Sequence, residues 1–213
     1  MKVGIIGSGL MGAALGRLWA RAGHEIVYTF AHSREKLEAL ARDSGPGARA
    51  GEVRDAVRGT DAVLLAVRWS TLDDALAQAG SLDGSIVITC SLPMTEDDSE
   101  LAIGRTTSGA EELARRLPGA RIALAFNTIP SELMTLRLES HAEGSSGDVI
   151  YCGDDDEAKS VAATLIRDAG FDPVDAGPLR IARYLEPFAL LVGQLAYETE
   201  LGPELGYRLL PSR

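Results

Sequence analysis

The chain has 213 residues, with 31 acidic and 21 basic side chains, so its formal net charge at pH 7 is −10. This balance argues against non-specific binding to nucleic acid and against binding to an anionic membrane surface, since both need clustered lysine and arginine. Two cysteines are too few for a disulfide framework, and no apolar run reaches the roughly 18 residues of a spanning helix, so we expect a cytoplasmic protein.

Strand-like and helix-like segments alternate along the chain. Apolar and β-branched runs predict strands at 2–6, 25–30, 62–67, 85–89, 122–126, 149–152 and 171–175. Helices are predicted up to residue 22, then at 33–41, 52–58, 71–79, 108–117 and 157–169, with a long helix from 179 to about 200. Segment 93–107 is expected to be a long loop. The alternation predicts an α/β fold with a Rossmann-type, doubly wound parallel sheet.

A glycine motif follows the first predicted strand and opens the first predicted helix. It reads Gly7-Ser8-Gly9-Leu10-Met11-Gly12, a G-x-G-x-x-G pattern that becomes specific in this strand-to-helix context. The first glycine permits the tight turn, the second lets the backbone approach a pyrophosphate, and the third lets the helix pack close to the strand. The motif therefore predicts a dinucleotide site at the helix N-terminus.

The end of the second predicted strand lacks the acid that binds the ribose 2′-hydroxyl of NAD. Hydrogen-bond donors gather there instead: His32, Ser33, Arg34 and Lys36. Such groups bind a 2′-phosphate, and arginine does so bidentately. This pattern favours NADP over NAD. The alternative is that Ser33 only caps a helix and that the side chains of Arg34 and Lys36 extend into water.

Three other strand ends are expected to face the same crevice, because ligands of doubly wound sheets bind at the carboxyl ends of the strands. Trp69 follows one strand and either contacts the cofactor or only fills a partly buried position. Ser91-Leu92-Pro93-Met94 and Asn127-Thr128-Ile129-Pro130 follow two others. The second segment offers an amide and a hydroxyl that can orient a flat heterocycle, or it is simply a turn.

Other chemistry is poorly supported. The histidines lack metal-ligand spacing, and no nucleophile elbow or lysine in an apolar pocket stands out. We expect no bound metal.

Taken together, these residues resemble the coenzyme F420-dependent NADP oxidoreductases, the NADPH-dependent 8-hydroxy-5-deazaflavin reductases. The resemblance covers nearly the whole chain. Its more specific segments are 107–111, 126–130, 152–157, 175–179 and 204–210, which a generic Rossmann domain has no reason to carry in this order.

The resemblance implies a hydride transfer between C4 of the nicotinamide and C5 of the deazaflavin, in a protein that mainly positions two rings. Ser8, Gly9, Leu10 and Met11 are expected to hold the pyrophosphate, and Ser33 and Arg34 the 2′-phosphate, with His32 as an alternative to Arg34. The rest of the implied site comprises Val67, Arg68 and Trp69 beside the cofactor, Leu92, Pro93, Asn127, Thr128 and Ile129 where the rings meet, and Leu209 and Leu210 closing the deazaflavin side.

This assignment divides the chain into an NADP-binding domain, 1–178, and a helical extension, 179–213, that closes the acceptor site. The family often has histidine where Asn127 stands, so other acceptors stay open: a flavin, a quinone, or a ferric chelate as in metalloreductases. A non-catalytic NADP-binding sensor is the alternative outside enzymes. A β-hydroxyacid dehydrogenase is disfavoured, since it needs a larger helical domain and a catalytic lysine. The long C-terminal helix is predicted to form a homodimer or to fold back on its own sheet.

Overall fold

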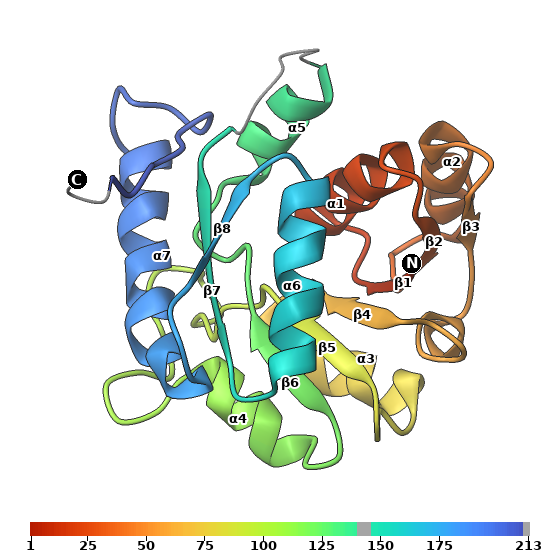
Figure 1. The fold of residues 1–213 in the computed structure, drawn as a ribbon, viewed down its shortest axis with the longest axis horizontal. Helices are drawn as coiled ribbons and strands as arrows, with labels where there is room; N and C mark the ends of the chain where they lie inside the picture. Colours follow the sequence, from red (N-terminus) through yellow and green to blue (C-terminus); the bar gives the residue numbers. More distant parts are fainter. Residues whose placement is uncertain (140–145, 211–213) are drawn as a thin grey trace.

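The computed structural model describes residues 1–139 and 146–210, so His141 lies outside the described residues. The elements are numbered in chain order as in Figure 1. Those before the fifth strand are β1 (Lys2–Ile6), α1 (Leu10–Arg21), β2 (Glu25–Thr29), α2 (Arg34–Ser44), β3 (Ala48–Ala50), η1 (Val53–Ala56), β4 (Ala62–Leu65), η2 (Trp69–Thr71) and α3 (Leu72–Ala79). Those that follow are β5 (Ile86–Thr89), α4 (Gly109–Arg116), β6 (Arg121–Leu124), α5 (Ser131–Glu139), β7 (Asp148–Gly153), α6 (Asp156–Asp168), β8 (Asp172–Asp175), η3 (Leu179–Ile181) and α7 (Ala182–Tyr197).

The strands form a mostly parallel eight-stranded sheet in the order β3-β2-β1-β4-β5-β6-β7-β8. The first six strands have the order of a doubly wound dinucleotide-binding sheet, which confirms the predicted fold class. β7 runs antiparallel to β6, and β8 is parallel to β7. Both edges are protected from further pairing, because β3 is only three residues long and β8 contains Pro173.

Helices cover both faces of the sheet, which explains why the central strands are apolar along their whole length. Side chains alternate between the two layers: Ile5 and Leu64 face one core, whereas Ile6 and Leu65 face the other. The first core is closed by α1, α2, α5 and α6, and the second by η1, α3, α4 and the start of α7. Figure 1 shows α1 and α2 beside β1–β3 and α7 at the opposite end of the sheet.

Three expectations from the sequence need correction. β3 was not expected, since Ala48-Arg49-Ala50 has little strand propensity, but it pairs with Ile26–Tyr28 of β2. α5 was not expected either; it buries only Leu133 and Met134, so its apolar periodicity is weak. The segment predicted to be helical at 52–58 is a single 3-10 turn.

The C-terminal helix is shorter than expected. A 3-10 turn occupies residues 179–181, and α7 ends at Tyr197 rather than near residue 200. The first part of its inner face is buried against the second core, but Tyr184, Leu191 and Tyr197 are each more than half exposed. Every described helix is too short or too polar to cross a lipid bilayer.

Candidate functional site

The carboxyl ends of five strands meet along one edge of the sheet, and backbone hydrogen bonds beyond the strands join them. These bonds link each strand end to its neighbour in the order β2, β1, β4, β5, β6: Gly7 N–H to the Thr29 carbonyl at 3.2 Å, Ala66 to Ile6 at 2.9 Å, Cys90 to Leu65 at 3.2 Å, and Ala125 to Thr89 at 3.0 Å. The segments singled out in the sequence after these strands therefore lie in one row, where doubly wound sheets bind ligands.

The glycine turn has the geometry that the motif requires. Gly7 has a φ of +104°, and a Cβ there would lie 2.3 Å from the Ala66 carbonyl oxygen. A Cβ on Gly12 would lie 2.0 Å from the Gly7 carbonyl oxygen, so this glycine lets α1 approach β1. Gly9 differs, because a Cβ there would meet nothing within 4 Å. The space beside Gly9 is thus open to a ligand.

Ser8, Leu10 and Met11 complete the turn. The Ser8 hydroxyl donates to the Thr29 carbonyl at 2.9 Å, and its N–H donates to Phe30 at 3.2 Å, so β2 uses both donors. The Leu10 side chain is 77% exposed, whereas Met11 is half-buried and packs against the core under α1.

The N-terminus of α1 is the one best suited to an anion. The first N–H groups of a helix have no intrahelical partner and carry a partial positive charge. In the described chain, α2 and α4 have serine caps, and α2, α3, α4 and α5 carry acids in their first turns. α1, which follows β1, has neither a side-chain cap nor an acid there. α7 also has neither, but it continues directly from the 3-10 turn at 179–181, whereas α1 begins at the end of a sheet strand. The first-turn amides of α1 therefore remain for a negatively charged group.

The donors predicted to bind a 2′-phosphate surround the start of α2. Ser33 caps this helix by accepting the Lys36 N–H at 3.3 Å, while the side chains of His32 and Lys36 extend into solvent. Arg34 is engaged by two carboxylates: its Nε donates to Glu38 at 3.0 Å and its Nη1 to Glu52 at 3.1 Å. An incoming phosphate would compete with these acids for the guanidinium.

Glu52 is one site residue that the sequence did not predict. Because β3 was not recognised, nothing placed residue 52 at the carboxyl end of a strand next to β2. β3 pairs in parallel with β2, so the residues after both strands lie at the same edge. A glutamate two positions beyond the end of β3 thereby reaches the arginine at the start of α2.

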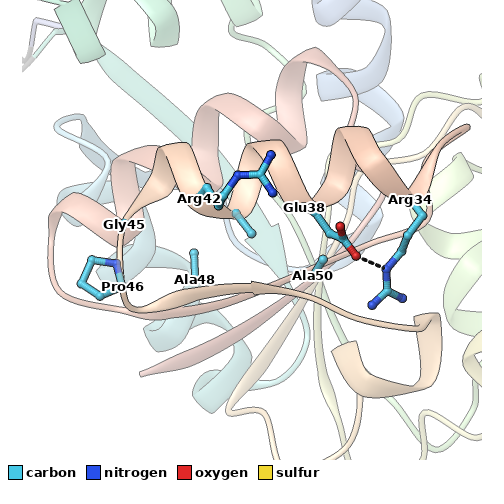
Figure 2. A pocket seen from close by; sticks show the side chains of 8 residues that line it. Arg34, Glu38, Arg42, Gly45, Pro46, Ala48 and Ala50 are labelled. Atoms are coloured by element: carbon cyan, nitrogen blue, oxygen red, sulfur yellow. Dashed lines mark hydrogen bonds and ion pairs between the residues drawn. The ribbon is translucent and has the colours of Figure 1, made fainter.

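A groove of about 620 Å³ runs along α2 and β3, away from the row of strand ends. Figure 2 shows Arg34 at one end of this groove, bonded to Glu38, and Pro46 at the other. Since Arg42, Ala48 and Ala50 line its middle, the groove follows the outer edge of the sheet. It meets the predicted cofactor site only at Arg34.

The segment after β4 is tied to its surroundings. Val67 is buried, and Trp69 is half-buried against the second core with the Arg116 guanidinium 5.5 Å from its ring centroid. Arg68 extends into solvent and pairs with Asp98 at 3.3 Å. Asp98 belongs to the expected loop 93–107, whose first part is closed by a bridge between Met94 and Leu101. The contacts of Trp69 are those of a packing residue.

The segment after β5 is held against β4. The Ser91 hydroxyl donates to the Val67 carbonyl at 2.7 Å, Leu92 is half-buried, and Pro93 is buried against Gly109. Burial raises the pKa of the Cys90 thiol to about 12. This cysteine therefore stays protonated and is not a nucleophile at neutral pH.

The segment after β6 holds neutral polar groups in buried positions. Asn127 donates from Nδ2 to the Leu185 carbonyl at 3.2 Å, while its Oδ1 is buried without a hydrogen-bond partner. The Thr128 hydroxyl lies 2.6 Å from the Tyr207 hydroxyl, and the side chain of Ile129 is buried. A buried acceptor without a donor costs about 1–3 kcal/mol, so the Asn127 carbonyl is a feature that needs an explanation.

Residues 207–209 lie against the start of β7. Because β7 runs antiparallel to β6, its start lies at the same edge of the sheet as the carboxyl end of β6. Asp148 donates its N–H to the Tyr207 carbonyl at 2.9 Å and accepts the Leu209 N–H on its carboxylate at 2.5 Å. The Leu209 and Leu210 side chains are 52% and 82% exposed. The structure thus places this segment beside Thr128, with both leucine side chains in solvent.

A buried carboxylate that the sequence did not single out lies on α7. Glu186 is 1% exposed and accepts the N–H groups of Gly109 at 2.8 Å and Ala110 at 2.9 Å. Burial raises its pKa to about 7, although the two backbone donors oppose that shift. Beside it, Arg183 forms a bidentate pair with Glu111 at 2.7 and 2.8 Å. Two separate links therefore join α7 to the start of α4.

Comparison with known proteins agrees with this geometry. Residues 2–93 match the family described as NADP oxidoreductase, coenzyme F420-dependent. The resemblance to this family is confirmed. The rat metalloreductase STEAP3 is 27% identical over 192 residues, which cover 89% of this chain and 36% of that protein. The chain thus spans about a third of this relative and is related to NADP-dependent oxidoreductases.

Solved structures share the fold over most or all of the chain. A protein from Arthrobacter sp. FB24, provisionally assigned as an F420-dependent NADP reductase, has a TM-score of 0.84 and 23% identity, covering 99% of this chain and 100% of that one. A hypothetical protein from Sinorhizobium meliloti has a TM-score of 0.72 and 25% identity, covering 100% and 97%. A reductive aminase from Aspergillus terreus, solved with NADPH, has a TM-score of 0.65 and 16% identity, covering 91% and 60%.

The same substitution at the first two glycines of the motif, buried Gly7 and exposed Gly9, is predicted to have different effects. Gly7→Ala forces a Cβ into a positive-φ position against the Ala66 carbonyl, so we expect it to lower the free energy of unfolding by about 2 kcal/mol or more. Gly9→Ala has room for its Cβ, so we expect unchanged stability but an NADPH Kd raised about tenfold or more. Urea unfolding and fluorescence titration check the pair; a Gly9→Ala variant that binds NADPH normally would contradict the pyrophosphate position.

The Arg34–Glu52 ion pair leads to the prediction that neutralising Glu52 raises the affinity of the site for a 2′-phosphate. Glu52→Gln frees Nη1 of Arg34 from a charged competitor, so we expect 2′,5′-ADP to bind about two- to fivefold more tightly, the scale of an exposed ion pair. Glu35→Gln removes an equal charge from the first turn of α2 without a contact to Arg34 and is the matched control. Calorimetry at low salt measures both; equal effects of the two variants would contradict a specific role for the ion pair.

Proposed function

We propose that the protein is an NADPH-dependent oxidoreductase that transfers a hydride between C4 of the nicotinamide and C5 of a deazaflavin, coenzyme F420. The observation that carries the proposal is the α1 N-terminus, which is uncapped, free of acids and open beside Gly9. The family match over residues 2–93, which include this motif and the start of α2, supports the same cofactor.

The residues present fit a dinucleotide phosphate. The free amides at the start of α1 suit the pyrophosphate, and Arg34, with His32 and Lys36 beside it, suits the 2′-phosphate. Across the row of strand ends, the unpartnered Asn127 carbonyl can accept an N–H donor, which a nicotinamide carboxamide or a deazaflavin ring carries. NADPH, when bound, supplies the hydride.

The chain's own contribution is positioning and exclusion of water. Half-buried Leu92 offers apolar surface after β5, next to the buried Pro93, and Asn127 and Thr128 supply neutral polar groups after β6. A direct hydride transfer between two rings needs the rings to be aligned in a site that excludes water. In this proposal, these side chains orient the rings, and Leu209 and Leu210 cover the acceptor from the side of β7 when it binds.

A ferric chelate is the second candidate acceptor. The observation that favours it is the 27% identity to a metalloreductase over 89% of this chain. That relative is almost three times longer than the matched region, so its acceptor need not be the partner of this domain alone. Flavins and quinones share the planar shape of a deazaflavin and complete the set of acceptors to compare.

The deciding experiment follows NADPH oxidation by the purified protein with 8-hydroxy-5-deazaflavin, a flavin, a quinone and a ferric chelate in parallel. We expect rapid bleaching of the deazaflavin, slower reaction with the others, and a clear preference for NADPH over NADH. Faster reduction of the ferric chelate would replace the deazaflavin by the second candidate. NADPH binding without turnover of any acceptor would identify a sensor, and equal use of NADH would contradict the 2′-phosphate assignment.

We further propose that the protein is a cytoplasmic homodimer joined through the outer face of α7. Tyr184, Leu191 and Tyr197 on this helix are 66%, 52% and 56% exposed and apolar or aromatic in character. Tyr184 and Leu191 are two turns apart and lie on one side of the helix. Light scattering at micromolar concentration is expected to give twice the mass of one chain. Leu191→Glu is expected to give the monomer; a monomeric wild type would contradict the dimer.

A further inference from the structure

Two consecutive residues of α7 bind the segments that follow two different strands. Leu185 accepts the side-chain N–H of Asn127, which follows β6, and Glu186 accepts the backbone N–H groups at the start of α4, which ends the segment after β5. Their separations in sequence from these partners are 58, 77 and 76 residues. One turn of α7 therefore holds two loops that lie far from it in the sequence.

The link to the β5 segment continues to Pro93. A Cβ built on Gly109 would lie 2.9 Å from the Pro93 ring, so the ring rests directly on the first residue of α4. Gly109 donates its N–H to Oε2 of Glu186 at 2.8 Å. The position of Glu186 thus sets the position of Gly109, and Gly109 supports Pro93.

The link to the β6 segment fixes the direction of the Asn127 amide. Nδ2 faces the Leu185 carbonyl, and rotating the amide by 180° would place two carbonyl oxygens against each other. Oδ1 consequently keeps its orientation although it has no donor in this structure. A shift of α7 at residue 185 would turn this carbonyl away from its present direction.

We propose that Glu186 is a positioning residue for the acceptor side of the site, setting the placement of Pro93 and Asn127 relative to each other through α4 and Leu185. The inference rests on the proposed function, because both loops belong to the predicted place where the rings meet. A buried carboxylate is costly to desolvate, and here two backbone donors offset part of that cost. An apolar residue would leave the buried N–H groups of Gly109 and Ala110 without acceptors, so the test reads stability and kinetics separately.

A neighbouring link between the same helices provides a matched control. Arg183 and Glu111 also join α7 to α4, but neither touches Gly109, Pro93 or Asn127 in a described contact. Glu111→Gln therefore weakens the attachment of α7 to α4, together with the contact of Glu111 with the Ser108 hydroxyl at 2.9 Å, but it leaves both backbone hydrogen bonds of Glu186 in place. Comparing it with Glu186→Gln separates positioning from attachment.

The test measures the NADPH Kd, steady-state kinetics with the acceptor, and the melting temperature of both variants. For Glu186→Gln we expect an NADPH Kd within twofold of wild type and a kcat/KM for the acceptor that is reduced by about tenfold or more. For Glu111→Gln we expect both values within twofold, whatever its melting temperature. Equal kinetic losses in the two variants, or unchanged kinetics in Glu186→Gln, would overturn the inference.

Two additions keep the test decisive. If Glu186→Gln does not fold, Gly109→Ala takes its place, because its Cβ displaces the Pro93 ring and leaves Glu186 intact; the same kinetic split is expected.

If wild type turns over no acceptor, the proposed function fails first. NMR of the Asn127 side-chain amide then decides the inference alone: its signals should move in Glu186→Gln and stay in Glu111→Gln, and unmoved signals in both would overturn it.

Discussion

The approach of α1 to β1 is the constraint on which the remaining site depends. The Gly12 backbone lies so close to the Gly7 carbonyl that no side chain fits between them. This contact brings the N-terminus of α1 to the end of β1, between the ends of β2 and β4 in the row of strand ends. Trp19, further along α1, donates to the Leu165 carbonyl at 2.8 Å and contacts Phe126 edge to face. The helix that carries the anion site thereby also positions α6 and the turn that leads to Asn127.

Much of this arrangement could be predicted from the sequence, because it depends on local rules. The glycine spacing, the alternation of apolar strands with helices, and the serine cap at Ser33 each act over a few residues, and all are found where expected. The long loop after β5 was located for the same reason, since its composition of acids, threonine and glycine favours no regular element.

Contacts between segments far apart in the sequence could not be predicted in this way. β3 exists because β2 offers it an edge, and the Arg34–Glu52 pair exists only because of that strand. The role of Glu186 depends on α7 crossing the start of α4, 76 residues away in the chain. Nothing in the apolar pattern of α7 distinguishes a glutamate that is buried from one in solvent. The unpartnered Asn127 carbonyl is likewise visible only in three dimensions.

The reversal of the chain at β7 has a consequence for the order in which the protein forms during synthesis. Strands β1 to β6 and the glycine turn are complete within the first 124 residues, so the surface for the dinucleotide can assemble early. The acceptor side needs Leu185, Glu186 and Tyr207, which contact Asn127, the start of α4 and Thr128. Under the proposed function, a chain emerging from the ribosome would therefore complete its nucleotide surface first, and reduction of an acceptor would begin only after these later residues had folded onto it.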